Sequence, residues 1–194
     1  MCPRTKEQNE LIRAQRREQI LYAAARAYFR TGGSFDIRDV ASEAGLGYGT
    51  VYHYYPNRVL LIQDVLESGF ERCELALDEW TNLRDISQDD GEVMAYCKAL
   101  LRLWKSDARA YLVYKMAAEL YAGLPEKDRS LAKRRFMERL YAPLQSMIQH
   151  DDDSIDQMLA ILVGCCGLSY YGGSSELNVD RIAWLAAQAT TKES

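Results

Sequence analysis

Apolar residues recur at helical spacing along most of the chain, and few stretches alternate apolar and polar residues as strands do. The first helical pattern predicts an amphipathic helix over residues 17–30, followed by Gly32 and Gly33. Further helices are predicted over residues 36–44, 48–55, 58–80, 92–104, 108–121, 126–149, 154–171 and 179–189. The pattern therefore predicts an all-α protein.

The segment DIRDVASEAGLGYGTVYHYYPNR, residues 36–58, predicts two short helices joined by a tight turn. Asp36 is placed to cap the first helix with its side chain. Gly45 follows where this helix must end, and glycine adopts the left-handed conformation at the least cost. Pro56 ends the second helix, and Asn57 is placed to cap the next one. Two short helices around such a turn form a helix-turn-helix.

Charge is distributed unevenly, although the formal net charge is only -4. Residues 1–60 hold nine Lys and Arg against six Asp and Glu, whereas the remainder holds 15 against 22. The basic part is the one that contains the helix-turn-helix pattern. This distribution favours phosphate contact there and an acidic body away from DNA, although a difference of this size also arises by chance.

At these residues the sequence resembles the TetR-like family of bacterial one-component transcriptional repressors. The similar block covers residues 20–65, and DVASEAGLGYGTVYHYYPNR matches the family's motif nearly position for position. Asp36 stands where the family usually has Ser or Thr, and the connector after Gly32 is a residue or two short. The resemblance implies an N-terminal arm with a three-helix DNA-binding unit, residues 1–56, and a C-terminal helical bundle for ligand binding and dimerisation, residues 57–194.

A recognition helix lying in the major groove of double-stranded DNA presents its N-terminal residues to base edges. Thr50 is expected there, with glycines that let the backbone come close, and Arg38 matches a base-reading position. Tyr52 and Arg58 suit phosphates, although Tyr52 also suits core packing, which is the interpretation for Tyr55. The residues expected to contact DNA are Arg38, Gly47, Tyr48, Gly49, Thr50, Tyr52, His53, Tyr54 and Arg58. The arginines within residues 1–19 suit either a DNA-following arm or a solvated lead-in to the first helix.

Aromatic residues, methionine and cysteine are frequent in the predicted C-terminal bundle. When such residues recur at helical spacing along one face of a helix, that face usually packs in the core. Because the TetR-like family binds effectors between these helices, a mostly apolar pocket with tyrosine hydroxyls is the competing hypothesis. The residues expected to bind a small-molecule effector are Trp80, Met94, Cys97, Trp104, Tyr111, Tyr114, Met116, Tyr121 and Tyr141.

The last two predicted helices suit a homodimer interface, as the resemblance implies. Small residues such as Gly164 and Gly167 let helices approach closely, and a two-fold dimer predicts a palindromic operator.

The five cysteines show no Cys-x-x-Cys spacing, which disfavours a disulfide framework or a zinc site. Cys165 and Cys166 are interpreted as packing residues, with a redox switch as the alternative. The longest apolar run, residues 158–168, is too short to cross a bilayer, so we expect a soluble cytoplasmic protein.

These patterns together predict a homodimeric repressor that a small, largely apolar ligand releases from DNA. The alternative is a helical ligand-binding or enzymatic protein that keeps the motif only as structure. A glycine-rich nucleotide loop at residues 45–50 is disfavoured, because no buried strand precedes it. No spaced set of acid, base and nucleophile indicates catalysis. We expect no cofactor and no metal, and His150 with the three following aspartates is interpreted as a solvated loop and helix cap.

Overall fold

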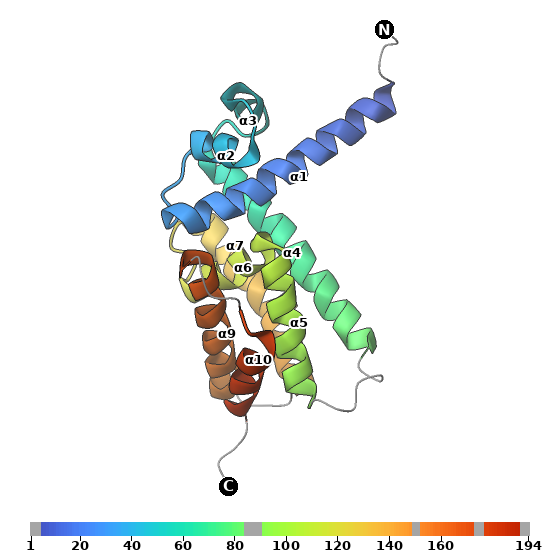
Figure 1. Ribbon diagram of the computed structural model, residues 1–194, viewed down its shortest axis with the longest axis vertical. Helices are drawn as coiled ribbons and strands as arrows, with labels where there is room; N and C mark the ends of the chain where they lie inside the picture. Colours follow the sequence, from blue (N-terminus) through green and yellow to red (C-terminus); the bar gives the residue numbers. More distant parts are fainter. Residues whose placement is uncertain (1–4, 84–90, 149–151, 173–176, 191–194) are drawn as a thin grey trace. The chain divides into compact units, whose positions relative to one another are not determined.

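The structure is a computed structural model that describes residues 5–83, 91–148, 152–172 and 177–190 (Figure 1). The described residues are mostly helical and contain no strand, which confirms the predicted all-α class. The helices are α1 (Lys6–Thr31), α2 (Ile37–Ala44), α3 (Tyr48–Tyr54), α4 (Arg58–Leu83), α5 (Glu92–Ser106), α6 (Ala108–Ala118), α7 (Glu126–Phe136), the π-helical turn η1 (Met137–Tyr141), α8 (Ala142–Ile148), α9 (Asp152–Gly172) and α10 (Val179–Gln188).

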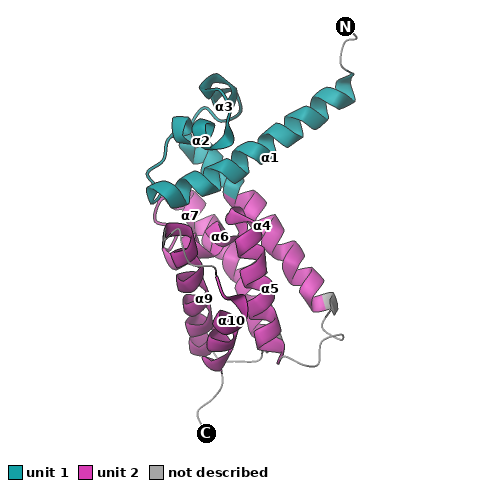
Figure 2. Cartoon of the chain, in the orientation of Figure 1, with its two compact units in different colours: residues 1–65 teal, residues 66–194 magenta. Residues whose placement is uncertain are grey.

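The chain forms two compact units, Met1–Val65 and Leu66–Ser194 (Figure 2). The division falls within α4, whereas the sequence prediction placed it before this helix, at residues 56 and 57. The first two turns of α4 carry buried side chains that belong to the core of the first unit, among them Leu61 and Val65. The helix therefore contributes to both units.

Helix α1 begins at Lys6, well before the start predicted at residue 17. Thr5 and Gln8 form a capping box: each side chain accepts a hydrogen bond from the backbone N–H of the other residue. The sequence Thr-Lys-Glu-Gln carries this signal, which the apolar pattern could not show because this end of the helix is exposed. Gly32 then ends the helix in the left-handed conformation, with φ 65°.

The helix-turn-helix forms as the pattern predicted. The Asp36 carboxylate accepts hydrogen bonds from the backbone N–H groups of Arg38 and Asp39, which satisfies donors that the first turn of α2 leaves free. Gly45 ends α2 with φ 64°. From α1, the Gln19 side chain donates to the carbonyl of Ala44, so that α1 helps to hold the end of α2.

The second unit is a bundle in which α5 packs against α6, α9 and α10, and α9 also packs against α6 and α10. Its core contains fully buried large side chains such as Trp104, Tyr111 and Leu112. Residues 126–148 are helical throughout, as predicted, but a wider π turn interrupts the α-helical geometry at η1. Pro143 follows this turn. Because a proline ring presses on the preceding turn of a regular α-helix, a widened turn relieves that contact.

Helices α4 and α6 approach closely where Gly69 faces Arg109. The Arg109 side chain is buried and donates to the Asp107 carboxylate at 2.8 and 3.0 Å and to the Ser68 hydroxyl at 2.9 Å. A buried guanidinium is stable only when such partners compensate for its lost hydration. This polar cluster fixes the crossing of α4 and α6.

Candidate DNA-binding surface and ligand pocket

Helix α3 exposes the side chains that the sequence analysis expected to read DNA. Tyr48 and Tyr52 retain 46% and 48% of their accessible surface, which is high for aromatic residues. Gly47, Gly49, Thr50 and His53 are also exposed, and Tyr54 is half-buried. These residues define the α3 surface. Packing within the first unit leaves the two tyrosine rings of this surface accessible.

The opposite side of α3 is anchored in the first unit. Val51 is fully buried and Tyr55 retains 5% of its surface. The Tyr55 hydroxyl donates to the Asp64 carboxylate at 2.8 Å, and Arg17 donates to the same oxygen at 2.9 Å. Burial and the Asp64 carboxylate raise the pKa of Tyr55 well above its ordinary value, so the hydroxyl stays protonated and donates. Tyr55 thus packs in the core, as the sequence analysis interpreted it, and fixes how α3 is presented.

Arg38 and two tyrosines form a continuous exposed group. The Arg38 guanidinium carbon lies 5.7 Å from the centre of the Tyr48 ring, and the Tyr48 and Tyr52 rings lie 5.6 Å apart. A cation over an aromatic ring is weakly attracted to it, which limits the positions that Arg38 samples. Arg38 on α2 and Tyr48 at the start of α3 therefore belong to one surface.

Arg58 and Arg17 have partners within the first unit. The Arg58 guanidinium donates to the Gly33 carbonyl and lies 5.0 Å from the centre of the buried Phe35 ring. Arg58 had been expected to contact phosphate because a cation at a helix N-terminus is unfavourable without an anion. In the structure, the Gly33 carbonyl and the Phe35 ring both interact favourably with a cation at this position. Arg17, one of the arginines of the predicted arm, lies on α1 and is bonded to Asp64 on α4.

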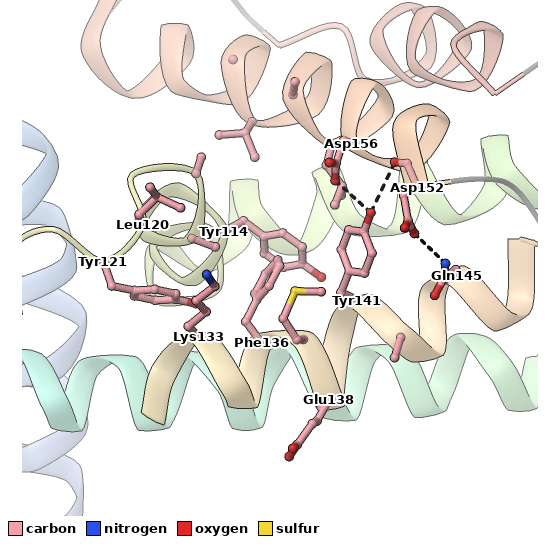
Figure 3. Close-up of a pocket in the computed structure, with 18 residues that line it drawn as sticks. Tyr114, Leu120, Tyr121, Lys133, Phe136, Glu138, Tyr141, Gln145, Asp152 and Asp156 are labelled. Atoms are coloured by element: carbon pink, nitrogen blue, oxygen red, sulfur yellow. Dashed lines mark hydrogen bonds between the residues drawn. The ribbon is translucent and has the colours of Figure 1, made fainter. Parts of the chain in front are cut away.

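The second unit contains a cavity of about 990 Å³ between α6, the segment from α7 to α8, and α9 (Figure 3). Aromatic and aliphatic side chains make up most of its wall, including Tyr114, Phe136 and Leu159. The turn after α6 contributes Leu120 and Tyr121. Their φ angles of 53° and 54° lie in the left-handed region, which is unfavourable for residues other than glycine. Strained backbone and π turns both concentrate at functional sites, and here both line one cavity.

Polar groups lie at the two ends of this cavity. At one end the Tyr141 hydroxyl donates to the Asp156 carboxylate at 2.9 Å, and the Gln145 amide donates to Asp152 at 2.6 Å (Figure 3). At the other end Tyr121 is buried and its hydroxyl has no hydrogen-bond partner among the described residues. Burial is the main cause that raises the pKa of both tyrosines, so each carries its proton near neutral pH.

Three of the nine residues predicted to bind an effector lie on the cavity wall: Tyr114, Tyr121 and Tyr141. The other six are not part of this wall. Among them Trp104, Tyr111, Cys97 and Met116 are buried, and Trp80 and Met94 are half-buried.

These six residues are placed by contacts among the helices. The Tyr111 ring stacks on Tyr170 with the ring centres 5.0 Å apart, and the Tyr111 hydroxyl donates to the Val163 carbonyl. Trp80 lies against Tyr96 with the ring centres 5.2 Å apart. These six residues therefore pack between the helices, which was the alternative interpretation of the aromatic residues.

The cavity also uses residues that the sequence analysis did not select. They are mainly small side chains that leave space and the polar groups at its ends. These residues are Ala117, Ala118, Leu120, Lys133, Phe136, Met137, Glu138, Ala142, Gln145, Asp152, Asp156, Leu159, Ala160, Val163 and Gly164. The available sequence signal for a cavity was the small residues, namely the adjacent Ala117 and Ala118 and the Ala160 and Gly164 pair on one helix face. Small residues, however, equally indicate close packing of helices.

The four described cysteines, Cys73, Cys97, Cys165 and Cys166, form no disulfide. Cys166 is fully buried and Cys165 is half-buried. Among the described residues no group of three His, Cys, Asp or Glu side chains is arranged to hold a metal ion. His150 lies outside them, whereas Asp152 begins α9. No described helix is both long enough and apolar enough to cross a lipid bilayer.

Comparison with family models and with curated proteins gives no match to the sequence. Solved structures do match. The multidrug-binding protein EbrR, solved in complex with imidazole, is 19% identical, with a TM-score of 0.53, over 92% of this chain and 97% of that chain. A Mesorhizobium loti protein assigned to the TetR family of transcriptional regulators matches with a TM-score of 0.55 and 17% identity, over 91% of this chain and 94% of that chain. The chain has a TetR-like fold.

Proposed function

We propose that this TetR-like chain is a sequence-specific DNA-binding transcriptional regulator of the cytoplasm, a homodimeric repressor that a small, largely apolar ligand releases from a palindromic operator. The observation that carries the proposal is the α3 surface. Its tyrosines Tyr48 and Tyr52 are about half exposed, while Val51 and Tyr55 on the other side are buried. A helix presented in this way suits insertion into a major groove, where its N-terminal residues reach base edges.

Both solved structures support a regulatory function that responds to a small molecule. One belongs to a protein assigned to the TetR family of transcriptional regulators, and the other to a multidrug-binding protein in complex with imidazole. Neither is an enzyme by its description. The alternative, an enzyme that keeps the motif only as structure, would leave the exposed tyrosines of α3 without a role.

Exposed apolar side chains on α9 and α10 support a homodimer. Leu168 and Tyr171 on α9 retain 70% and 51% of their surface, and Trp184 and Leu185 on α10 retain 51% and 43%. The two helices pack against each other, so their exposed residues belong to neighbouring elements. A two-fold dimer through these helices would bury the apolar residues and pair two α3 helices on a palindrome.

Helix α6 links the cavity to α4. Tyr114, Ala117 and Ala118 at one end of α6 line the cavity, and Arg109 at the other end is bonded to Ser68 on α4. A ligand that fits the cavity better in one arrangement of α6 would shift the population toward that arrangement. The shift is limited to the difference in its affinity for the two states.

The experiment is DNA binding measured by gel shift, with the purified full-length protein and the DNA upstream of its own gene. We expect affinity to fall steeply with salt, because neutralising phosphates releases counterions. Tyr52→Phe should weaken binding to all sequences by about threefold to tenfold if its hydroxyl contacts a phosphate. Thr50→Ala should instead change which operator substitutions are tolerated.

The matched control is Tyr22→Phe, which removes the same hydroxyl group from an exposed tyrosine on α1. This change should leave DNA affinity unaltered. Equal effects of the changes at Tyr22 and Tyr52 would contradict the proposed contact surface. Absence of salt-dependent binding to any selected genomic fragment would contradict DNA binding itself.

A further inference from the structure

The cavity of the second unit has two chemically different ends, as Figure 3 shows. The Asp152 and Asp156 carboxylates lie at one end, beside Tyr141 and Gln145. The Tyr121 hydroxyl lies at the other end. Tyr114, Phe136 and the aliphatic wall lie between them. A ligand that fills this space must therefore be apolar in its middle and polar at its ends.

The Asp156 end suits a cation. One carboxylate oxygen of Asp156 accepts a hydrogen bond from the Tyr141 hydroxyl, and the Asp152 carboxylate accepts one from the Gln145 amide. These hydrogen bonds come from neutral groups, so they orient the carboxylates without neutralising their charge. Glu138 also belongs to the wall, but its side chain points away from the cavity (Figure 3).

Asp152 and Asp156 are exposed, and a bound apolar body would exclude part of the water from this end of the cavity. The lower local dielectric would strengthen the attraction between the carboxylates and a cationic group. The rings of Tyr141 and Phe136 would add to this attraction, because aromatic faces attract cations.

The Tyr121 hydroxyl is an independent sign that a ligand belongs here. The residue retains 1% of its surface and lies on the wall, yet its hydroxyl has no hydrogen-bond partner among the residues described. A buried donor without an acceptor is unfavourable. Less than 1 Å² of this hydroxyl oxygen is accessible, so a ligand acceptor at this end would satisfy it together with a small shift of the side chains that cover it. The Lys133 side chain lies on the same part of the wall (Figure 3).

We propose that the cavity binds an elongated aromatic amine, with its protonated amino group at Asp156 and Asp152 and its apolar body between Tyr114, Phe136 and Leu159. A hydrogen-bond acceptor at the far end of the ligand meets Tyr121. This assignment rests on the proposed function, in which the same cavity holds the effector, and it names the chemical class of that effector.

The test compares three probes of equal length that differ in charge: 4-phenylbutylamine, 4-phenylbutan-1-ol and 4-phenylbutyrate. Their affinities for the full-length protein are measured by calorimetry at pH 7. We expect the amine to bind about tenfold more tightly than the alcohol, and the carboxylate to bind more weakly than both. An alcohol or carboxylate that binds as tightly as the amine would overturn the proposal, and so would the absence of binding by all three.

Asp156→Asn locates the preference within the cavity, because it removes the charge and keeps an acceptor for Tyr141. The amine should lose about tenfold in affinity and the alcohol should be unaffected. Asp153→Asn is the matched control: Asp153 is exposed in the same turn of α9 and does not line the cavity, so both affinities should stay as they are. Equal losses in the two variants would contradict the assignment. Ala160→Phe, which places a ring in the cavity, should weaken binding of every probe, and unchanged binding would overturn the assignment of the probes to this cavity.

The Tyr121 end is tested with an amine that carries an acetyl group at the far end of its ring. The acetylated probe should bind more tightly than 4-phenylbutylamine to the wild-type protein, and Tyr121→Phe should remove the difference. A difference that persists in this variant would contradict the role of Tyr121.

The gel shift described above separates this inference from the proposed function. DNA binding without an amine preference would overturn the ligand class alone. An amine preference without DNA binding would support the ligand site and overturn the regulatory function.

Discussion

Gly69 is the residue of α4 that allows α6 to approach closely, and replacing it with alanine should destabilise the protein. A β-carbon at this position would lie 2.6 Å from the Arg109 carbonyl oxygen and 2.8 Å from a methyl group of Val113. The valine methyl can rotate away, but the carbonyl belongs to the backbone of α6. The two helices would therefore have to separate, which also disturbs the hydrogen bond from Arg109 to Ser68.

Two opposing effects decide the sign of this change. Alanine is favoured over glycine inside a helix by about 0.8–1.0 kcal/mol. Forcing extra volume into a packed contact costs about 1–3 kcal/mol, and a weakened hydrogen bond to a buried charged group costs about 1.5–3 kcal/mol when it is lost completely. The unfavourable effects are larger, so we expect Gly69→Ala to lower the free energy of unfolding by about 1–3 kcal/mol.

Urea unfolding in reducing buffer at one protein concentration measures this difference. Gly164→Ala is the control, because Gly164 is also inside a helix and a β-carbon there would meet nothing within 4 Å. That change should raise the free energy of unfolding by up to about 1 kcal/mol. A Gly69→Ala protein as stable as the wild type would refute the reasoning, because propensity would then outweigh the contact between α4 and α6.

Three further predictions concern the anchoring of α3, the buried thiols and the dimer. Tyr55→Phe removes the hydrogen bond to Asp64 and should lower the free energy of unfolding by about 1 kcal/mol in urea melts; an unchanged midpoint would contradict a structural role for this bond. Burial raises the pKa of Cys97 to about 12, so the unfolded thiol ionises first, and stability that is present below about pH 9 should be lost as pH rises toward 12. Cys97→Ala should flatten this loss by up to about 1.4 kcal/mol per pH unit between urea melts at pH 9.5 and 11, and equal slopes would argue against it. Leu168→Glu together with Trp184→Glu should convert a dimer to monomers in light scattering and weaken DNA binding, whereas a dimer that persists would exclude the proposed interface.

Local signals in the sequence predicted much of the first unit. The cap at Asp36, the left-handed Gly45 and the cap at Asn57 all form, because each depends on hydrogen bonds or backbone angles within a few residues. The start of α1 was missed for the opposite reason. Its capping box at Thr5 precedes an exposed stretch, where apolar spacing carries no information.

The cavity was less predictable than the helices around it. Large aromatic residues were predicted to line it, but Trp104 and Tyr111 among them fill the core instead. Space arises where side chains are small, at Ala117 and Ala160 for example, and a small residue indicates either a cavity or a close helix contact until its neighbours are known. The π turn was also missed, although Pro143, which follows it, was a local signal for an irregular turn.

The sequence by itself determined the succession of helices, their caps and the motif that presents α3, because these follow from interactions between residues near each other in the chain. Only the tertiary structure decided which side chains meet across helices. It gave Arg58 partners at Gly33 and Phe35, and it brought Asp156 within hydrogen-bonding distance of Tyr141 beside a cavity. Such pairings depend on the packing of distant segments, and the spacing of residues along one helix does not contain that information.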